Sequence, residues 1–239
     1  ELIEGELTSF AIPAGATKIR SNCFYGYTAL TGVTIPDSVA SIGDAAFASC
    51  QFLTAVSIPE GITSIESATF NSCISLTSAS LPDSLVALKS RAFNGCTHLQ
   101  NLTIPVNVTN IEANALVIGA TTIKATITMK PTTPPTIQSN TIGANVEKII
   151  VPAASYNAYV TATNWAAYAD KIIWNKSVSL VYEGNEVVQV IVEDILGNTS
   201  GYAYRAPADN SEYSAGYYWA DEPIYEMEIE GHILTFEPV

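Results

Sequence analysis

The chain has 239 residues, of which 48% are hydrophobic and 14% are charged. This composition supports a packed core and argues against global disorder. A net charge of −13 repels phosphate backbones, so we expect no nucleic-acid partner. The chain contains no apolar run of about 18 residues, so we also expect no membrane-spanning segment.

A 23-residue repeat runs through the first half of the chain. Five prolines keep this step without slippage, and so do five columns of apolar residues. A unit this short does not enclose its own apolar face, so successive units must stack and bury that face against their neighbours. The proline column is Pro13, Pro36, Pro59, Pro82 and Pro105, and the aromatic column is Phe24, Phe47, Phe70, Phe93 and Leu116.

The residues before each proline predict a short strand. In Leu76–Pro82, Ala79 and Leu81 alternate with Ser80, which is the period of two that a strand requires. Proline has no amide hydrogen to donate to a ladder, so it belongs at the end of the strand. Strands stacked in register form a parallel sheet with a spacing of about 4.8 Å.

The repeat resembles a known family. Leu30–Cys50 reads Leu-Thr-x-Val-x-Ile-Pro-x-Ser-Val-x-Ser-Ile-Gly-x-x-Ala-Phe-x-x-Cys, which is similar to the BspA-like leucine-rich repeat. The resemblance covers about residues 7–121. It implies a leucine-rich-repeat solenoid of five regular repeats, with a parallel β-sheet and short helical or irregular returns.

The repeat is interrupted before the first domain ends. Pro131–Pro135 breaks the period, so we expect an irregular loop over residues 122–148. Residues 149–174 resemble the terminal unit that often closes such arrays. Their alternation of small and aromatic side chains predicts a short amphipathic helix that caps the core. Residues 1–174 are therefore expected to form one solenoid with its cap.

The outward positions of the predicted sheet are small and neutral. Two interpretations stay open for the column that lies on each strand: a hydroxyl ladder that stabilises the sheet, or a shallow groove for a peptide or a glycan. This face has no aromatic platform for sugars and no charge for a highly charged ligand. The candidate groove residues are Thr34, Ser57, Ser80 and Thr103.

No residue pattern predicts catalysis, a metal site or a cofactor. Three cysteines share one repeat column, where a small buried apolar residue fits a tight turn, and Cys23 has a different phase. A disulfide or metal ladder is the alternative. His98 and His232 are expected at the surface, and Glu66, Lys89 and Glu112 are expected to form a surface ion ladder. The column cysteines are Cys50, Cys73 and Cys96.

Residues 175–239 predict a second, small β-rich domain. They hold 12 acidic and 2 basic residues and 7 of the 12 tyrosines, whereas residues 1–174 hold 11 acidic and 8 basic residues. Two hairpins are predicted, over residues 177–192 and 224–236. Aromatic residues between them either recognise a ligand or build the core of a small domain. These candidates are Tyr202, Tyr204, Tyr217, Tyr218 and Trp219.

The family resemblance implies a secreted or cell-surface bacterial protein that binds a host protein or glycan without enzymatic activity. The start Glu1–Glu4 lacks the basic and apolar regions of a signal peptide, so either the protein is not exported or such a peptide has been removed. The family resemblance implies that it has been removed. Two alternatives stay open. One is a structural spacer that presents a C-terminal module, and the other is an enzyme of unrecognised type.

Overall fold

The computed structural model describes residues 9–174 and the strands at 178–183, 186–193, 199–203, 226–229 and 232–235. The chain divides into two units, Glu1–Asn175 and Lys176–Val239.

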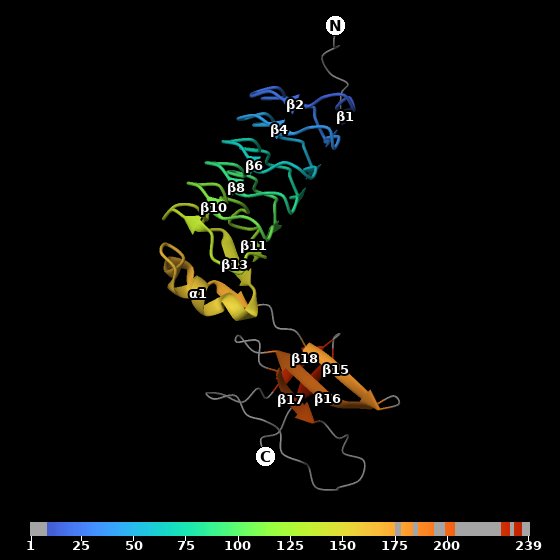
Figure 1. The fold of residues 1–239 in the computed structure, drawn as a ribbon, viewed down its shortest axis with the longest axis vertical. Helices are drawn as coiled ribbons and strands as arrows, with labels where there is room; N and C mark the ends of the chain where they lie inside the picture. The colour runs from blue at the N-terminus through green and yellow to red at the C-terminus, as the bar shows by residue number, and fades with distance from the viewer. Residues whose placement is uncertain are drawn as a thin grey trace. The chain divides into compact units, whose positions relative to one another are not determined.

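The first unit is a stack of coils, each of which contributes one strand to a parallel sheet on one face. Figure 1 shows the coils following one another from β1 to the α1 end of the stack. Phe10 pairs with Val33, and Val56 pairs with Ala79, so neighbouring strands keep the step of the sequence repeat. The strands form the orders β1-β3-β5-β7 and β9-β11-β13-β14. Their bounds are β1 Ser9–Ala11, β3 Gly32–Thr34, β5 Ala55–Ser57, β7 Ser78–Ser80, β9 Asn101–Ile104, β11 Ala125–Met129, β13 Val146–Val151 and β14 Ile172–Trp174.

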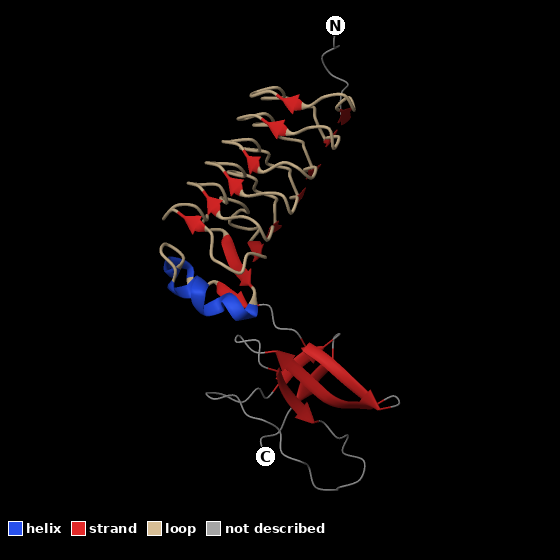
Figure 2. Cartoon of the chain, in the orientation of Figure 1, coloured by secondary structure: helices blue, strands red, loops and turns tan. Residues whose placement is uncertain are grey.

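A second column of shorter strands follows the proline of each coil. Each strand is two residues long and places one apolar side chain in the core, as Ile42 and Ile65 do. Figure 2 shows these short strands separated from the first column by loops. They form the parallel orders β2-β4 and β6-β8-β10-β12. Their bounds are β2 Lys18–Ile19, β4 Ser41–Ile42, β6 Ser64–Ile65, β8 Ala87–Leu88, β10 Asn110–Ile111 and β12 Thr136–Ile137.

The returns between β2, β4, β6 or β8 and the next sheet strand are turns. Alternate amides donate to the next coil and within the coil: Phe47 N–H donates to the Thr69 carbonyl at 2.9 Å, and Ala48 N–H donates to the Ala45 carbonyl at 3.1 Å. Backbone groups are therefore satisfied without a helix. Two residues of each turn have a positive φ. The first column is Asn22, Ala45, Ala68 and Arg91, continued by Asn114 after β10, and the second column is Gly26, Ser49, Ser72 and Gly95.

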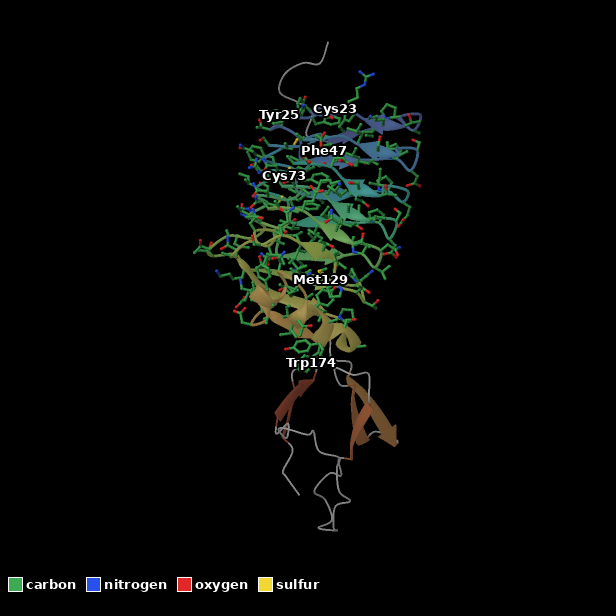
Figure 3. All side chains as sticks on the ribbon, turned by 60° about the vertical axis from the view of Figure 1, so that its left-hand side comes forward. Cys23, Tyr25, Phe47, Cys73, Met129 and Trp174 are labelled. Carbon is green, nitrogen blue, oxygen red and sulfur yellow. The ribbon has the colours of Figure 1, made fainter. Side chains whose placement is uncertain are left out.

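The aromatic column forms a continuous stack in the core. Ring centroids are 5.1 Å apart for Phe24 and Phe47, 5.5 Å for Phe47 and Phe70, and 5.3 Å for Phe70 and Phe93. The last three rings are fully buried, and Figure 3 marks Phe47 within the stack of coils. The predicted solenoid of stacked repeats is confirmed, and this column runs through its core.

The expectation of an irregular loop over residues 122–148 is wrong. Strands β11 and β12 lie in this segment, and β13 begins in it. Leu102 pairs with Ile127, and Ile111 pairs with Ile137. In each of these pairs the two residues are separated by more than the 23 residues of the regular repeat. Extra residues in the turns shift the period without ending the stack. Between β11 and β12, the segment Pro131–Pro135 contains no strand or helix.

A cap covers the last coil. It comprises the 3₁₀ turn Ala153–Ser155, the helix α1 (Tyr156–Thr161) and the 3₁₀ turn Ala166–Tyr168. The rings of Tyr159 and Trp165 are buried edge to face with centroids 4.9 Å apart. Tyr159 Oη donates to the Pro131 carbonyl at 2.8 Å, and Trp165 Nε1 donates to the Pro135 carbonyl at 2.7 Å. The cap thus satisfies carbonyls that the irregular proline segment leaves without strand partners.

In the second unit the structure describes two sets of antiparallel strands. Strand β16 pairs with both β15 and β17, and β18 pairs with β19. The β-rich domain that these strands are predicted to build stays a prediction. Within the described residues, no helix has the length and apolar character needed to cross a bilayer. The bounds are β15 Val178–Glu183, β16 Glu186–Glu193, β17 Thr199–Ala203, β18 Glu226–Ile229 and β19 His232–Thr235.

Candidate binding face

The structure brings the four predicted groove residues into one column. They lie on β3, β5, β7 and β9, and all four side chains are exposed. The register places Ala11 beside Thr34, and Ser57 beside Ser80, so the column runs across adjacent strands. Beyond β9, Thr103 continues the column to Thr128 on β11.

A hydroxyl ladder does exist, but in a different column. Thr54 Oγ1 donates to the Thr31 carbonyl at 3.0 Å, and Thr77 Oγ1 donates to the Thr54 carbonyl at 3.0 Å. These threonines precede the sheet strands and tie successive coils together. The hydroxyls of Ser57 and Ser80 make no hydrogen bond within the described part of the chain. The face column therefore has free donors and acceptors that the sheet does not use.

An acidic row borders this face. Asp37, Glu60 and Asp83 each follow a column proline, on three successive coils, and all are exposed. Glu60 is held in place because its carboxylate accepts the amides of Asp83 and Ser84 at 3.2 and 3.3 Å. Lys130 Nζ lies 4.0 Å from Asp83 Oδ1. These contacts give the carboxylates of Glu60 and Asp83 a role in joining the coils.

The column cysteines are buried free thiols, which confirms that they serve as small core residues. Each Sγ donates to a phenylalanine carbonyl one coil earlier, as Cys73 does to Phe47 at 3.1 Å. Burial raises the pKa of Cys50 to about 11 and that of Cys73 to about 12. Both thiols are therefore protonated near neutral pH and are poor nucleophiles. Cys23, outside this column, is exposed.

His98 is exposed, as expected, and is not placed for acid–base catalysis. Its Nδ1 lies 2.6 Å from the Ile74 carbonyl, and the described residues give it no carboxylate partner. His232 lies on β19 in the second unit. Within the described residues, no three His, Cys, Asp or Glu side chains are grouped closely enough to bind a metal ion.

The predicted ion ladder is present between two of its three members. Lys89 Nζ lies 3.0 Å from Glu112 Oε1, and this hydrogen bond, with the nearby Glu112 charge, raises the pKa of Lys89. Glu112 also accepts the amide of Ser90 at 3.1 Å. Glu66 lies one coil earlier, and its charge raises the Lys89 pKa further. The ion pair of Lys89 and Glu112 links the turns of two neighbouring coils.

Of the predicted aromatic recognition residues, the structure describes the backbone of one. Tyr202 lies on β17 and pairs with Val190 on β16. The other four lie outside the described residues, so their role stays a prediction. They are Tyr204, Tyr217, Tyr218 and Trp219.

Sequence reasoning missed three exposed apolar side chains, one in the returning turn of the first coil and two just before the sheet strands β5 and β7. Tyr25 is 61% exposed, Phe52 is 58% exposed and Ile74 is 39% exposed. Figure 3 shows Tyr25 at the edge of the first coil. The available signal was a departure from the repeat, because neighbouring coils place Ala48 and Ser75 in the columns of Tyr25 and Phe52.

A shallow hollow near the end of the stack was also missed. It is lined by side chains of both charges, but Lys171 Nζ already donates to the Val146 carbonyl at 2.8 Å. The hollow contains no histidine or thiol and no grouping that points to chemistry. Its lining is Lys124, Ala144, Val146, Glu147, Asp170 and Lys171.

The parallel strands, the stacked apolar columns and the cap define a solenoid of the leucine-rich-repeat class. The model of the BspA type leucine rich repeat region matches residues 4–129 in six copies, so the chain belongs to this family. Six copies are one more than the columns of the sequence show. The sixth extends to β11, inside the segment where a loop was expected.

Several solved structures resemble the chain. PcpA, a pneumococcal vaccine antigen, is 20% identical with a TM-score of 0.55, over 69% of this chain and 39% of that one. The leucine-rich-repeat protein TpLRR of T. pallidum is 25% identical with a TM-score of 0.47, over 52% of this chain and 59% of that one. A leucine-rich cell surface protein of Faecalibacterium prausnitzii is 28% identical with a TM-score of 0.38, over 62% of this chain and 55% of that one.

The chain thus spans between 39% and 59% of the length of these three proteins. The likeness to PcpA supports the fold alone. No match was found among curated proteins.

Proposed function

We propose that the chain is a non-enzymatic binding protein of the bacterial cell surface or exterior, and that it serves adhesion. Its family supports this proposal, because stacked repeats create extended surfaces that are widely used for binding. The observation that carries the proposal is the exposed column Thr34, Ser57, Ser80 and Thr103, whose hydroxyls are not used by the sheet. The ligand class is a protein or a glycan.

If this face binds the ligand, bulky substitutions at its exposed positions should abolish binding while the core stays intact. Ser57→Arg with Ser80→Arg places two bulky cations on exposed positions of β5 and β7. Ser41→Arg is the matched control, because Ser41 is exposed on β4 in the other strand column. We expect the double variant to lose binding to immobilised host matrix proteins or glycans, while the control keeps it. Equal binding by both variants would refute a role for this face.

A structural spacer is the second candidate. The division of the chain into two units favours it, because a capped solenoid can present a separate module. In that case recognition resides in residues 175–239, and the tyrosines around Tyr202 become the candidates. The full chain and residues 1–174 are compared on the same protein and glycan arrays. A binding solenoid keeps its ligand after removal of residues 175–239, whereas a spacer loses it.

A further inference from the structure

Charged side chains are confined to one part of each coil. In four successive coils, residues 21–36, 45–59, 67–82 and 92–105 contain no Asp, Glu, Lys or Arg. We call the exposed side chains of these four segments the neutral surface. The segments form the returning turns, the corner and the sheet strands β3, β5, β7 and β9. The charged residues of the same coils lie after the prolines, as Asp37, Glu60 and Asp83 do.

The corner of the neutral surface is continuous from coil to coil. Ser75 N–H donates to the Gln51 carbonyl at 3.1 Å, and His98 N–H donates to the Ile74 carbonyl at 3.3 Å. Phe52, Ile74 and His98 therefore lie on three adjacent coils, immediately before the sheet strands. Gly26 N–H donates to the Ala48 carbonyl at 2.8 Å, which places Tyr25 beside the turn of the second coil.

The two exposed aromatic rings are not required by the fold. The column of Phe52 contains Ala29, Ser75 and His98 in the other coils, and the column of Tyr25 contains Ala48, Asn71 and Asn94. In the other coils, small or polar residues thus occupy both positions without disturbing the repeat. In contrast, the rings that the repeat does require are buried, as Phe47, Phe70 and Phe93 are. The repeat can therefore be built without these two rings, and their exposure leaves both available to a ligand.

We propose that Tyr25 and Phe52 are a stacking platform for an uncharged glycan that extends onto the hydroxyl-bearing sheet face. Sugar rings present apolar C–H faces to aromatic rings, and their hydroxyls pair with neutral donors and acceptors. The neutral surface offers both. The exposed side chains of Gln51, Gln100 and Asn101 make no hydrogen bond within the described residues.

The absence of charge favours a glycan over a protein on this surface. About a quarter of the residues of an average protein are charged. When a protein partner binds a surface that has no counter-charges, its charged residues in the interface lose their hydration and gain no ion pair in return. An uncharged glycan has no such cost. The proposal rests on the binding function proposed above and names its ligand class and its first contacts.

The test uses the full chain in native gels that contain one soluble polysaccharide each. The neutral probes are a β-glucan, an α-mannan, a galactomannan and starch, and heparin is the charged control. We expect at least one neutral polysaccharide to retard the chain. Raising NaCl from 50 to 500 mM changes that affinity by no more than about twofold, because neutral ligands are not screened.

The variant Tyr25→Ala with Phe52→Ala weakens the affinity measured by this retardation about tenfold. The reason is that each ring contributes a binding free energy similar to that of an aromatic pair. Val106→Ala is the matched control, because Val106 is an exposed apolar residue, 47% accessible, outside the neutral surface. Thermal melts of both variants keep the wild-type midpoint, as expected for exposed positions.

Three results would overturn the proposal. The first is retardation by heparin alone that weakens with salt, and the second is wild-type retardation of the double aromatic variant. The third is binding to a matrix protein with no retardation by any neutral polysaccharide, which leaves the proposed binding function intact. If neither proteins nor polysaccharides bind, the proposed function fails as well.

Discussion

Replacement of Phe70 by alanine tests the stacked aromatic column directly. Phe70 is fully buried, and its ring is nearly parallel to both neighbours, at 3° to Phe47 and 14° to Phe93. Truncation of a buried phenylalanine costs about 3–5 kcal/mol of unfolding free energy, and the cost rises when the site does not collapse. Collapse is restricted here because Phe70 N–H donates to the Ala92 carbonyl of the next coil at 2.9 Å. We therefore expect a loss of about 4–5 kcal/mol.

Phe24→Ala is the internal comparison. Phe24 has the same column position, but it is only half-buried. It stacks on Phe47, and its contact with Phe10 is tilted. Its loss is expected to be about 1–3 kcal/mol. Urea unfolding of both variants, followed by far-ultraviolet circular dichroism, measures the two free energies. A cost for Phe70→Ala below about 1 kcal/mol, or no larger than that of Phe24→Ala, would show that the column is not a principal source of stability.

Three further predictions concern the turns, the cap and the thiols. Ala68 has a φ of 57°, and Asn22 and Asn114 occupy the same column, so Ala68→Asn should stabilise the chain by about 0.5–1 kcal/mol in urea unfolding. A lower stability would contradict this strain argument. Tyr159→Phe leaves the buried Pro131 carbonyl without its donor, and a loss of about 1–3 kcal/mol should appear as a lower melting temperature. An unchanged melt would mean that this bond does not hold the cap. At pH 8 a thiol reagent should modify Cys23 rapidly, while Cys73, whose pKa is raised to about 12, reacts only after denaturation. Rapid reaction of all four thiols would exclude the buried column.

The regular columns were predictable because each coil repeats the same environment. Ile42 and Ile65, one repeat apart, are both buried on β4 and β6, and the aromatic column stacks as its spacing predicts. A strict period leaves one way to bury all apolar positions at once, which is to stack the units in register.

The end of the array was predicted less well, for a physical reason. Loops tolerate extra residues at little energetic cost, so the period can drift while the backbone ladder continues. Ile127 pairs with Leu102 on β9 although the spacing has changed, and the segment 122–148 is therefore part of the solenoid. The 23-residue repeat in the sequence therefore ends before the solenoid does.

Taken by itself, the sequence determined the class of fold, the identity of the core columns and the uncharged outward face. Only the tertiary structure decided which hydroxyls are occupied. Thr54 bonds to the coil before it, whereas Ser57, three residues later, faces solvent. The structure also decided that Tyr25 and Phe52 are exposed, because the exposure of a side chain depends on where its coil turns and on what the next coil places beside it.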